Sequence, residues 1–247
     1  FEPRLALRYD LKKNSSIKAS YNRSLQYLHL LSNSTSSQPT DIWVPSSNNI
    51  KPQTSNQASV GYFRNFKDNT YELSVETYYK TMKNAIDYRN GANLFFNDQA
   101  EGELVYGKGR AYGVELLFRR QTGKLTGWVS YTWSRSLRTF DDINEGSEFP
   151  AKQDRIHDVA IVAMYTLSDR VKLAANWIYY TGAAVTFPSG KYEIEGITIP
   201  LFSERNGYRM PQYHRLDIGV TVDAKTKNPK FESSWNFSVY NAYARRN

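Results

Sequence analysis

Residues 110–136 read RAYGVELLFRRQTGKLTGWVSYTWSRS, and they contain two stretches in which apolar and polar side chains alternate. In the first stretch every second residue within 112–118 is apolar or aromatic, and in the second the same holds within 129–133. A polar turn around Gly123 separates the two stretches. Because successive side chains of a β-strand point to opposite faces, this pattern predicts an antiparallel hairpin with one apolar face.

The same alternation recurs along the whole chain and predicts ten strands of about 10 to 15 residues. Strands of soluble proteins are usually nearer 5 or 6 residues, whereas a tilted strand needs about 9 to 11 to cross a bilayer. The predicted strands cover 3–13, 17–31, 57–66, 70–82, 110–121, 125–136, 156–167, 171–181, 213–224 and 231–243.

The connections between these strands alternate between short and long. The short ones are polar turns at 13–16, 67–69, 122–124, 168–170 and 225–230. The long ones cover 32–56, 83–109, 137–152 and 182–212, and the alternation within 191–201 predicts a small hairpin inside the last. Short turns on one side and long loops on the other are typical of transmembrane β-barrels, in which the turns are periplasmic and the loops extracellular.

The amino-acid composition excludes or disfavours several classes of protein. The chain has no cysteine, so thiol chemistry is excluded, and no apolar run approaches the 18 residues of a membrane helix. Its net charge is +8, but lysine and arginine are scattered along the chain, which disfavours nucleic-acid binding. Aromatic residues make up 15% of the chain, a content that suits binding surfaces or the girdles of a membrane barrel.

The apolar parity of each strand must face lipid if the chain spans a membrane, because hydrocarbon does not tolerate charge. The opposite parity carries Arg8, Glu72, Glu115 and Asp217, which need water or polar partners inside the barrel. A soluble β-protein would instead turn the apolar parity into its core. Strand length, loop asymmetry and the aromatic residues near strand ends favour the membrane.

Three segments resemble the late barrel strands of TonB-dependent receptors. The family's Gly-x-Glu strand, tight turn and Gly-x-x-Ser-Tyr-Thr strand match YGVELLFRRQTGKLTGWVSYTWSRS, residues 112–136. Its proline–x–x–His-Arg-Leu-Asp strand matches MPQYHRLDIGVTV, residues 210–222, and its aromatic-rich strand with Asn and Tyr matches SWNFSVYNAYARRN, residues 234–247. The three motifs occur in the family's order and at its spacing.

The resemblance implies an all-β, antiparallel transmembrane barrel of about 22 strands closed by an N-terminal plug domain. A short N-terminal box would contact the inner-membrane protein TonB. Residues 1–247 show neither plug nor box, and the family's last two strands would follow Asn247. We therefore expect one incomplete domain, a barrel segment that begins within a larger protein or after a removed signal peptide, and that does not close on itself.

No motif indicates an enzyme, since HExxH, Walker-type and GxSxG sequences are absent. Glu72 and Glu76 share one strand face, but carboxylates that line a wet lumen explain them better than an acid–base pair. His29, His157 and His214 are candidate metal ligands by residue type. On the parity count all three face lipid on separate strands and do not converge, so neither a metal nor a cofactor is expected.

The long loops are the expected ligand surface, because aromatic side chains in polar sequence can stack on sugars, chelates or peptide side chains. Packing of loop against loop is the alternative explanation for the same residues. The candidates are Trp43, Tyr88, Phe95, Phe96, Phe187 and Tyr192, together with Phe202.

Arginines near the loop-side strand ends are candidates for contact with lipid phosphates. Arginine binds phosphate with a bidentate fork, and Arg135, Arg138 and Arg155, with Lys152, flank one long loop. Solvated charge, or pairing with Asp141, Asp142 and Glu145, would explain the same residues.

By resemblance, the function is energy-coupled import of a scarce nutrient across a Gram-negative outer membrane: siderophore-bound iron, cobalamin, a glycan or a peptide. The expected partners are outer-membrane lipid and lipopolysaccharide, the rest of the barrel and plug, TonB, and a surface lipoprotein. A passive porin or small barrel, and a soluble adhesin or carbohydrate-binding β-protein, are the alternatives.

Overall fold

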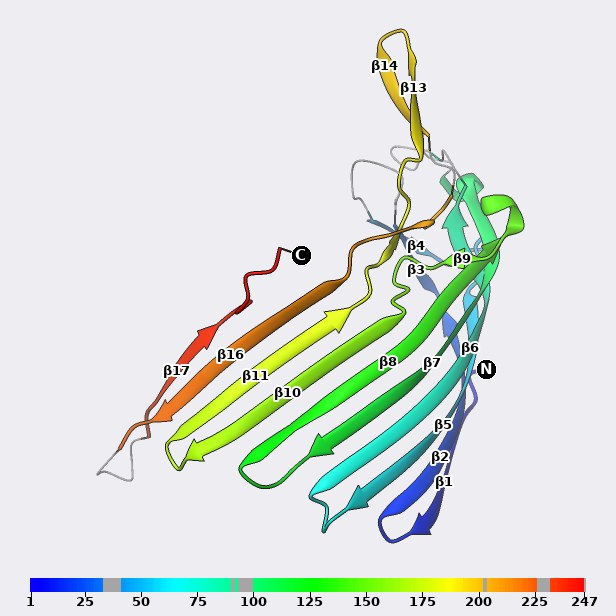
Figure 1. Cartoon of the computed structure of the whole chain (residues 1–247). Coiled ribbons are helices and arrows are strands. Elements are labelled where there is room, and N and C mark those ends of the chain that lie inside the picture. Colours follow the sequence, from blue (N-terminus) through cyan, green and yellow to red (C-terminus); the bar gives the residue numbers. More distant parts are fainter. Residues whose placement is uncertain (33–40, 90–91, 93–99, 202–203, 226–231, 247) are drawn as a thin grey trace.

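A computed structural model describes residues 1–32, 41–89, 92, 100–201, 204–225 and 232–246. Its main feature is one curved antiparallel sheet in which each wall strand pairs with its neighbours in sequence order (Figure 1). The order is β1-β2-β5-β6-β7-β8-β10-β11-β16-β17, and the short β9 pairs with β8 beside this path. All ten predicted wall strands are present. The strand predicted over 17–31 leaves the wall at Gln26, and within the described part of 231–243 only Ser234–Val239 is a strand.

The wall strands differ in length along the sheet. Their bounds are β1 Arg4–Lys12, β2 Ser15–Gln26, β5 Gln53–Phe66, β6 Tyr71–Tyr88, β7 Leu104–Arg120, β8 Leu125–Phe140, β10 His157–Ser168, β11 Val171–Tyr180, β16 Tyr213–Asp223 and β17 Ser234–Val239. With 18, 17 and 16 residues, β6, β7 and β8 exceed what a bilayer requires. They extend past the predicted ends at 82, 110 and 136, so part of the expected loops is paired sheet.

The remaining elements lie at the loop end. They are β3 Leu28–Ser32 with β4 Asp41–Pro45, β12 Ala184–Val185 with β15 Tyr208–Arg209, and β13 Gly190–Ile194 with β14 Ile197–Leu201, besides β9 Phe149–Pro150 and the 3₁₀ turns Ala100–Glu103 and Asn144–Gly146. The β13–β14 hairpin confirms the predicted alternation within 191–201 and projects away from the sheet (Figure 1).

Turn chemistry places the short connections at the opposite end of the sheet. Lys67, Asp68 and Asn69 all have positive φ between β5 and β6, and Gly123 has φ of 100° between β7 and β8. Asn and Gly adopt this region readily, so the chain reverses within a few residues. Figure 1 shows these turns at one end and the long connections at the other, as the loop lengths predict.

The sheet does not close. β1 and β17 are its two edges, and within the described residues no pairing joins them. An exposed edge carries unpaired backbone N–H and C=O groups that hydrocarbon cannot satisfy. The open sheet is therefore a segment of a barrel wall, as expected.

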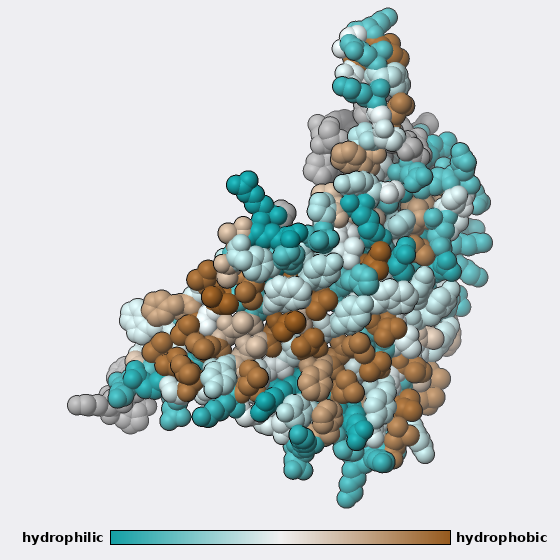
Figure 2. Space-filling model, in the orientation of Figure 1, coloured by the Kyte–Doolittle hydropathy of each residue, from teal (hydrophilic) through white to brown (hydrophobic). Residues whose placement is uncertain are grey.

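The two faces of the wall differ in polarity. On the outer face, aromatic rings pack on one another near the turns (Phe66, Tyr71 and Phe118) and again toward the loops, where Tyr79 stacks on Tyr112 and Trp133 meets Tyr112 edge-on. Figure 2 shows apolar residues in a band across the strands, with hydrophilic residues toward both ends. The inner face carries polar pairs such as Ser20–Ser59, with oxygens 2.7 Å apart. This arrangement is typical of a membrane barrel.

The buried apolar residues gather at the loop end, not within the wall. One cluster consists of Ala85, Val105, Phe140, Ile143 and Phe149, and another of Leu31, Ile50, Ile86 and Leu104. Both lie where β6–β8 extend beyond the other strands and the long connections pack against them. No helix among the described residues is long and apolar enough to cross a membrane.

Candidate functional site

The long connections are fastened to the wall by two buried ion-pair networks, and Arg205 is the centre of the first. Its guanidinium donates to Asp87 Oδ1 at 2.7 Å and to the carbonyl oxygen of Tyr88 at 3.0 Å, and it lies 4.5 Å from the centre of the Tyr88 ring. Its backbone N–H donates to Asn144 Oδ1 at 2.8 Å. Arg205 thus joins the 182–212 connection to β6 and to the loop after β8.

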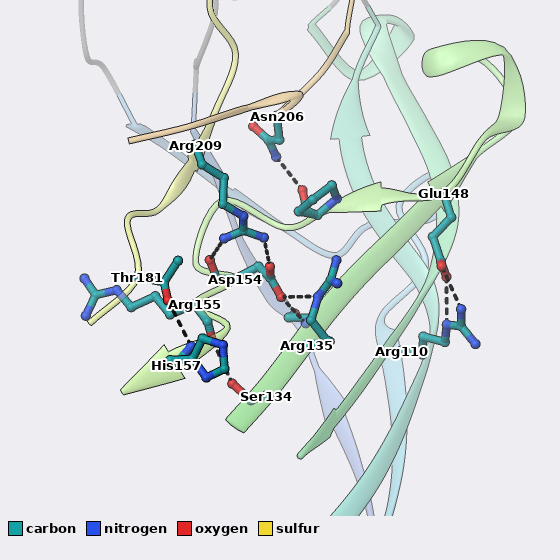
Figure 3. Close-up of polar contacts among 12 residues, drawn as sticks. Arg110, Ser134, Arg135, Glu148, Asp154, Arg155, His157, Thr181, Asn206 and Arg209 are labelled. Carbon is teal, nitrogen blue, oxygen red and sulfur yellow. Dashed lines mark hydrogen bonds and ion pairs between the residues drawn. The ribbon is translucent and has the colours of Figure 1, made fainter. Parts of the chain in front are cut away.

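Asp154 is the centre of the second network and is fully buried (Figure 3). One of its carboxylate oxygens accepts from Arg209, and the other accepts from the backbone N–H of Ser136 and lies 3.6 Å from Arg135 Nε. Arg209 also donates to the carbonyl oxygen of Asp154 at 2.8 Å and to that of Gly182 at 3.2 Å. Loss of one partner of such a buried pair is strongly destabilising, because the other charge stays buried.

A cavity of about 430 Å³ lies beside the Arg205 network at the inner face of the wall. Lys80 lines it from β6, on the same strand face as Glu72 and Glu76, and Met82 follows on that face. Four cations line the cavity against one carboxylate, Asp87. The cations are Lys80, Arg138, Lys152 and Arg205, and the polar lining is completed by Gln26, Gln53, Gln153 and Asn206 with His29. The cavity therefore presents a positive surface at the loop end of the inner face.

His29 lies beside this cavity and not on the lipid face, which corrects the prediction from parity. It is buried on β3, and its Nε2 lies 3.2 Å from Ser46 Oγ. Burial lowers the pKa of His29, so the imidazole adds no charge at neutral pH. The parity count failed because the chain bends after Gln26, and β3 pairs with β4 instead of continuing the wall.

The other two histidines lie in the wall as expected. His157 Nδ1 is 2.9 Å from Tyr131 Oη, and His214 Nδ1 is 2.6 Å from Tyr243 Oη. Both belong to the aromatic rows of the outer face. Among the described residues no group of three or more His, Cys, Asp or Glu side chains is placed to hold a metal ion.

The aromatic loop candidates that the structure describes do not form one cluster. Trp43 on β4 and Phe187 are each 60% exposed, and Tyr192 on β13 is 42% exposed. Phe187 packs on Tyr208 with ring centres 5.2 Å apart, which is loop-to-loop packing. Tyr88 is only 1% exposed beneath Arg205, so its assignment to a ligand surface is wrong in this structure. Phe95, Phe96 and Phe202 lie outside the described residues.

The three candidate lipid-binding arginines have contacts within the chain. Arg138 lines the inner cavity 3.9 Å from Asp87, so its assignment to lipid headgroups is wrong, because its side chain faces inward. Arg135 is beside Asp154, and the Arg155 guanidinium lies 4.0 Å from the centre of the Tyr180 ring. The carboxylate partners of Arg135 and Arg138 are Asp154 and Asp87, not the acidic residues 141, 142 and 145.

Two of the inner carboxylates, Glu72 and Asp217, have structural partners too. Glu72 accepts from Gln121 Nε2 at 3.0 Å, and Glu76 lies opposite Glu115 in the register of β6 and β7. Asp217 accepts from Arg215 at 2.8 Å and from the backbone N–H of Asn241 at 3.0 Å. The Asp217–Asn241 contact joins the His-Arg-Leu-Asp motif on β16 to the Tyr-Asn-Ala-Tyr segment that follows β17.

Gly127, the glycine of the Gly-x-x-Ser-Tyr-Thr motif, has φ of 145°. A Cβ atom there would lie 2.0 Å from the carbonyl oxygen of Val162 on β10. Only glycine allows this approach of backbone to backbone without a shift.

A family model described as "TonB dependent receptor-like, beta-barrel" matches residues 1–242. The chain belongs to this family. It is a segment of the barrel of an outer-membrane protein. No curated protein matches the sequence. Membership of this family does not favour the alternative interpretations of the chain as a passive porin or a soluble adhesin.

Solved structures share the fold at low identity. The ferric-catecholate import receptor Fiu from E. coli K12 is 17% identical, with a TM-score of 0.63. The match covers 98% of this chain and 30% of that protein. The FrpB iron transporter from Neisseria meningitidis is 14% identical, with a TM-score of 0.63 and coverages of 99% and 35%. The ferripyoverdine receptor of Pseudomonas aeruginosa is 13% identical, with a TM-score of 0.64 and coverages of 99% and 29%. The chain thus spans about a third of these proteins.

Sequence reasoning missed the residues that organise the loop end, namely Asp87, Asp154, Arg205 and Arg209. The partners in these networks are separated by up to 118 positions in the sequence. The available signal was the apolar alternation at Ile86 and Tyr88, and at Leu104 and Tyr106, which indicates strands within a predicted loop.

Proposed function

We propose that this chain supplies wall and outer loops to a TonB-dependent receptor that imports a negatively charged nutrient complex. The observation that supports this proposal is the cavity at the loop end of the inner face, where four cations face one carboxylate. Substrate arriving from outside meets this surface first. A cleft of one sign raises the local concentration of an oppositely charged ligand.

Among the nutrients considered, ferric siderophores with anionic chelating groups agree best with this charge. Cobalamin, a neutral glycan or a peptide gains less from it. The Fiu, FrpB and ferripyoverdine receptor structures are of iron or ferric-chelate transporters. Trp43, Phe187 and Tyr192 are exposed near the loop end and are proposed to contact the ligand while it is captured.

The complete receptor would couple this capture to TonB through its plug. The expected role is transport, not catalysis. Arg155 is proposed to contact lipid headgroups at the outer rim, and a surface lipoprotein remains a predicted partner.

The test uses the full-length parent receptor, purified and folded. Lys80 and Lys152 line the cavity without forming a described ion pair, so Lys80→Gln with Lys152→Gln removes charge without orphaning a carboxylate. Two partly screened charge contacts correspond to a loss of about tenfold in affinity for a ferric tricatecholate. The matched control is Lys13→Gln with Lys191→Gln, two exposed lysines on a turn and on β13. Equal affinity in the cavity variant and its control would contradict an anionic substrate.

A further inference from the structure

The outer face of β5, β6 and β7 contains an apolar groove of about 500 Å³ near the loop end. Small side chains form its floor, and the larger rings of Tyr79, Tyr112 and Trp133 border it. The floor residues are Ala58, Val60, Thr77 and Val114. Arg110 also lines the groove, two positions beyond Tyr112 toward the loops.

Two lysines stand directly above this groove. Tyr79 pairs with Tyr112 in the register of β6 and β7, and Lys83 pairs with Lys108. Each lysine is four positions from its tyrosine, so it lies on the same outer face and farther toward the loops. Both lysines are exposed.

Within the described residues, no carboxylate balances the positive charge of Lys83 and Lys108. Side chains directly opposite on adjacent antiparallel strands are close neighbours, and like charges there are destabilising. In the part of the chain that the structure describes, neither Lys83 nor Lys108 forms an ion pair. Arg110 does have a carboxylate, since it donates to both oxygens of Glu148 at 2.8 and 2.7 Å (Figure 3).

We propose that this surface binds a phosphorylated, multiply acylated lipid of the outer leaflet, of the lipid A type. Its acyl chains occupy the groove between the aromatic rings, and a phosphate lies between Lys83 and Lys108. The phosphate removes the repulsion between the lysines, and the apolar floor accepts the chains that such a lipid places directly below its phosphates. Arg110, held by Glu148, borders the boundary between headgroup and chains.

This site differs from the lipid contacts expected from sequence. Arg138 faces inward and Arg135 is beside Asp154, whereas Lys83 and Lys108 point to the membrane. The proposal does not depend on which substrate the receptor transports.

The test uses the full-length parent receptor in discs of phosphatidylethanolamine, with the bound lipid counted by native mass spectrometry. Lys83→Ala with Lys108→Ala should weaken retention of bisphosphorylated lipid A by about thirtyfold, the factor for two lysines beside an anionic lipid. Lys13→Ala with Lys191→Ala changes the net charge equally and should leave retention unchanged. Thr77→Trp fills the groove and should also weaken retention, with the heat-modifiable barrel intact.

Two further lipids separate the contribution of the phosphates to retention from that of the acyl chains. Dephosphorylated lipid A and phosphatidylglycerol should each be retained much less than bisphosphorylated lipid A. In discs without lipid A, the double lysine variant should be at least as stable as the parent, because a repulsion has been removed. Unchanged retention in the double variant, or equal retention of the three lipids, would overturn the proposal.

Discussion

The wall and the loop end of this molecule are held together in different ways. In the wall, the two faces alternate residue by residue, the apolar side chains remain exposed for lipid, and side-chain contacts join neighbouring strands. At the loop end, apolar residues are buried and ion pairs join distant segments, as between Arg205 and Asp87 or Arg209 and Asp154. The wall needs a membrane to cover its outer face, while the loop end carries its own small core.

The largest effect should come from the buried carboxylate of the loop end. Asp154→Ala leaves Arg209 without its carboxylate, and we expect a local loss of about 3 to 5 kcal/mol in the stability of the 204–212 segment. Hydrogen exchange of that segment should accelerate while the wall strands keep their protection. Asp141→Ala, at an exposed carboxylate after β8, is the matched control. Equal acceleration in the wall would show that the two regions are one cooperative unit.

The wall is tested by charge placed on each face of β10. Ile161 is on the outer face between Val129 and Trp177, and Val162 is on the inner face between Trp128 and Asn176. Ile161→Arg should cost about 2 to 4 kcal/mol of folding free energy in a bilayer, and Val162→Arg distinctly less. Heat-modifiable mobility of the folded barrel in gels measures both. Equal losses would mean that the faces are assigned incorrectly.

The difference between the regions also explains what sequence could predict. The period of two is local, so it predicts the ten wall strands and their faces, whereas the open sheet is expected from the family resemblance. The alternation fails at Asn84, which has φ of 55° and interrupts the register between Lys83 and Ala85. The alternation therefore predicts a loop where β6 continues to Tyr88. It also fails at His29, because the chain bends after Gln26 and the alternation no longer tells which side chains face lipid. The inward position of Arg138 and the burial of Tyr88 and Asp154 depend on contacts between distant segments, which no local pattern contains.

The most direct test of the account measures ligand binding in two variants of the full-length parent, one altered at each end of the sheet. Arg89 and Glu103 already meet at 3.0 Å, backbone N to backbone O, so residues 90–102 can be replaced by an Asn-Gly turn that closes β6 onto β7. Inserting two glycines at Gly123 disturbs a single β7–β8 turn at the opposite end of the sheet, just as the replacement disturbs a single β6–β7 connection at the loop end. We expect loop replacement to abolish binding of the ferric chelate and turn insertion to preserve it, with both barrels folded. Equal loss of binding in both folded variants would contradict the claim that the loop end captures the substrate.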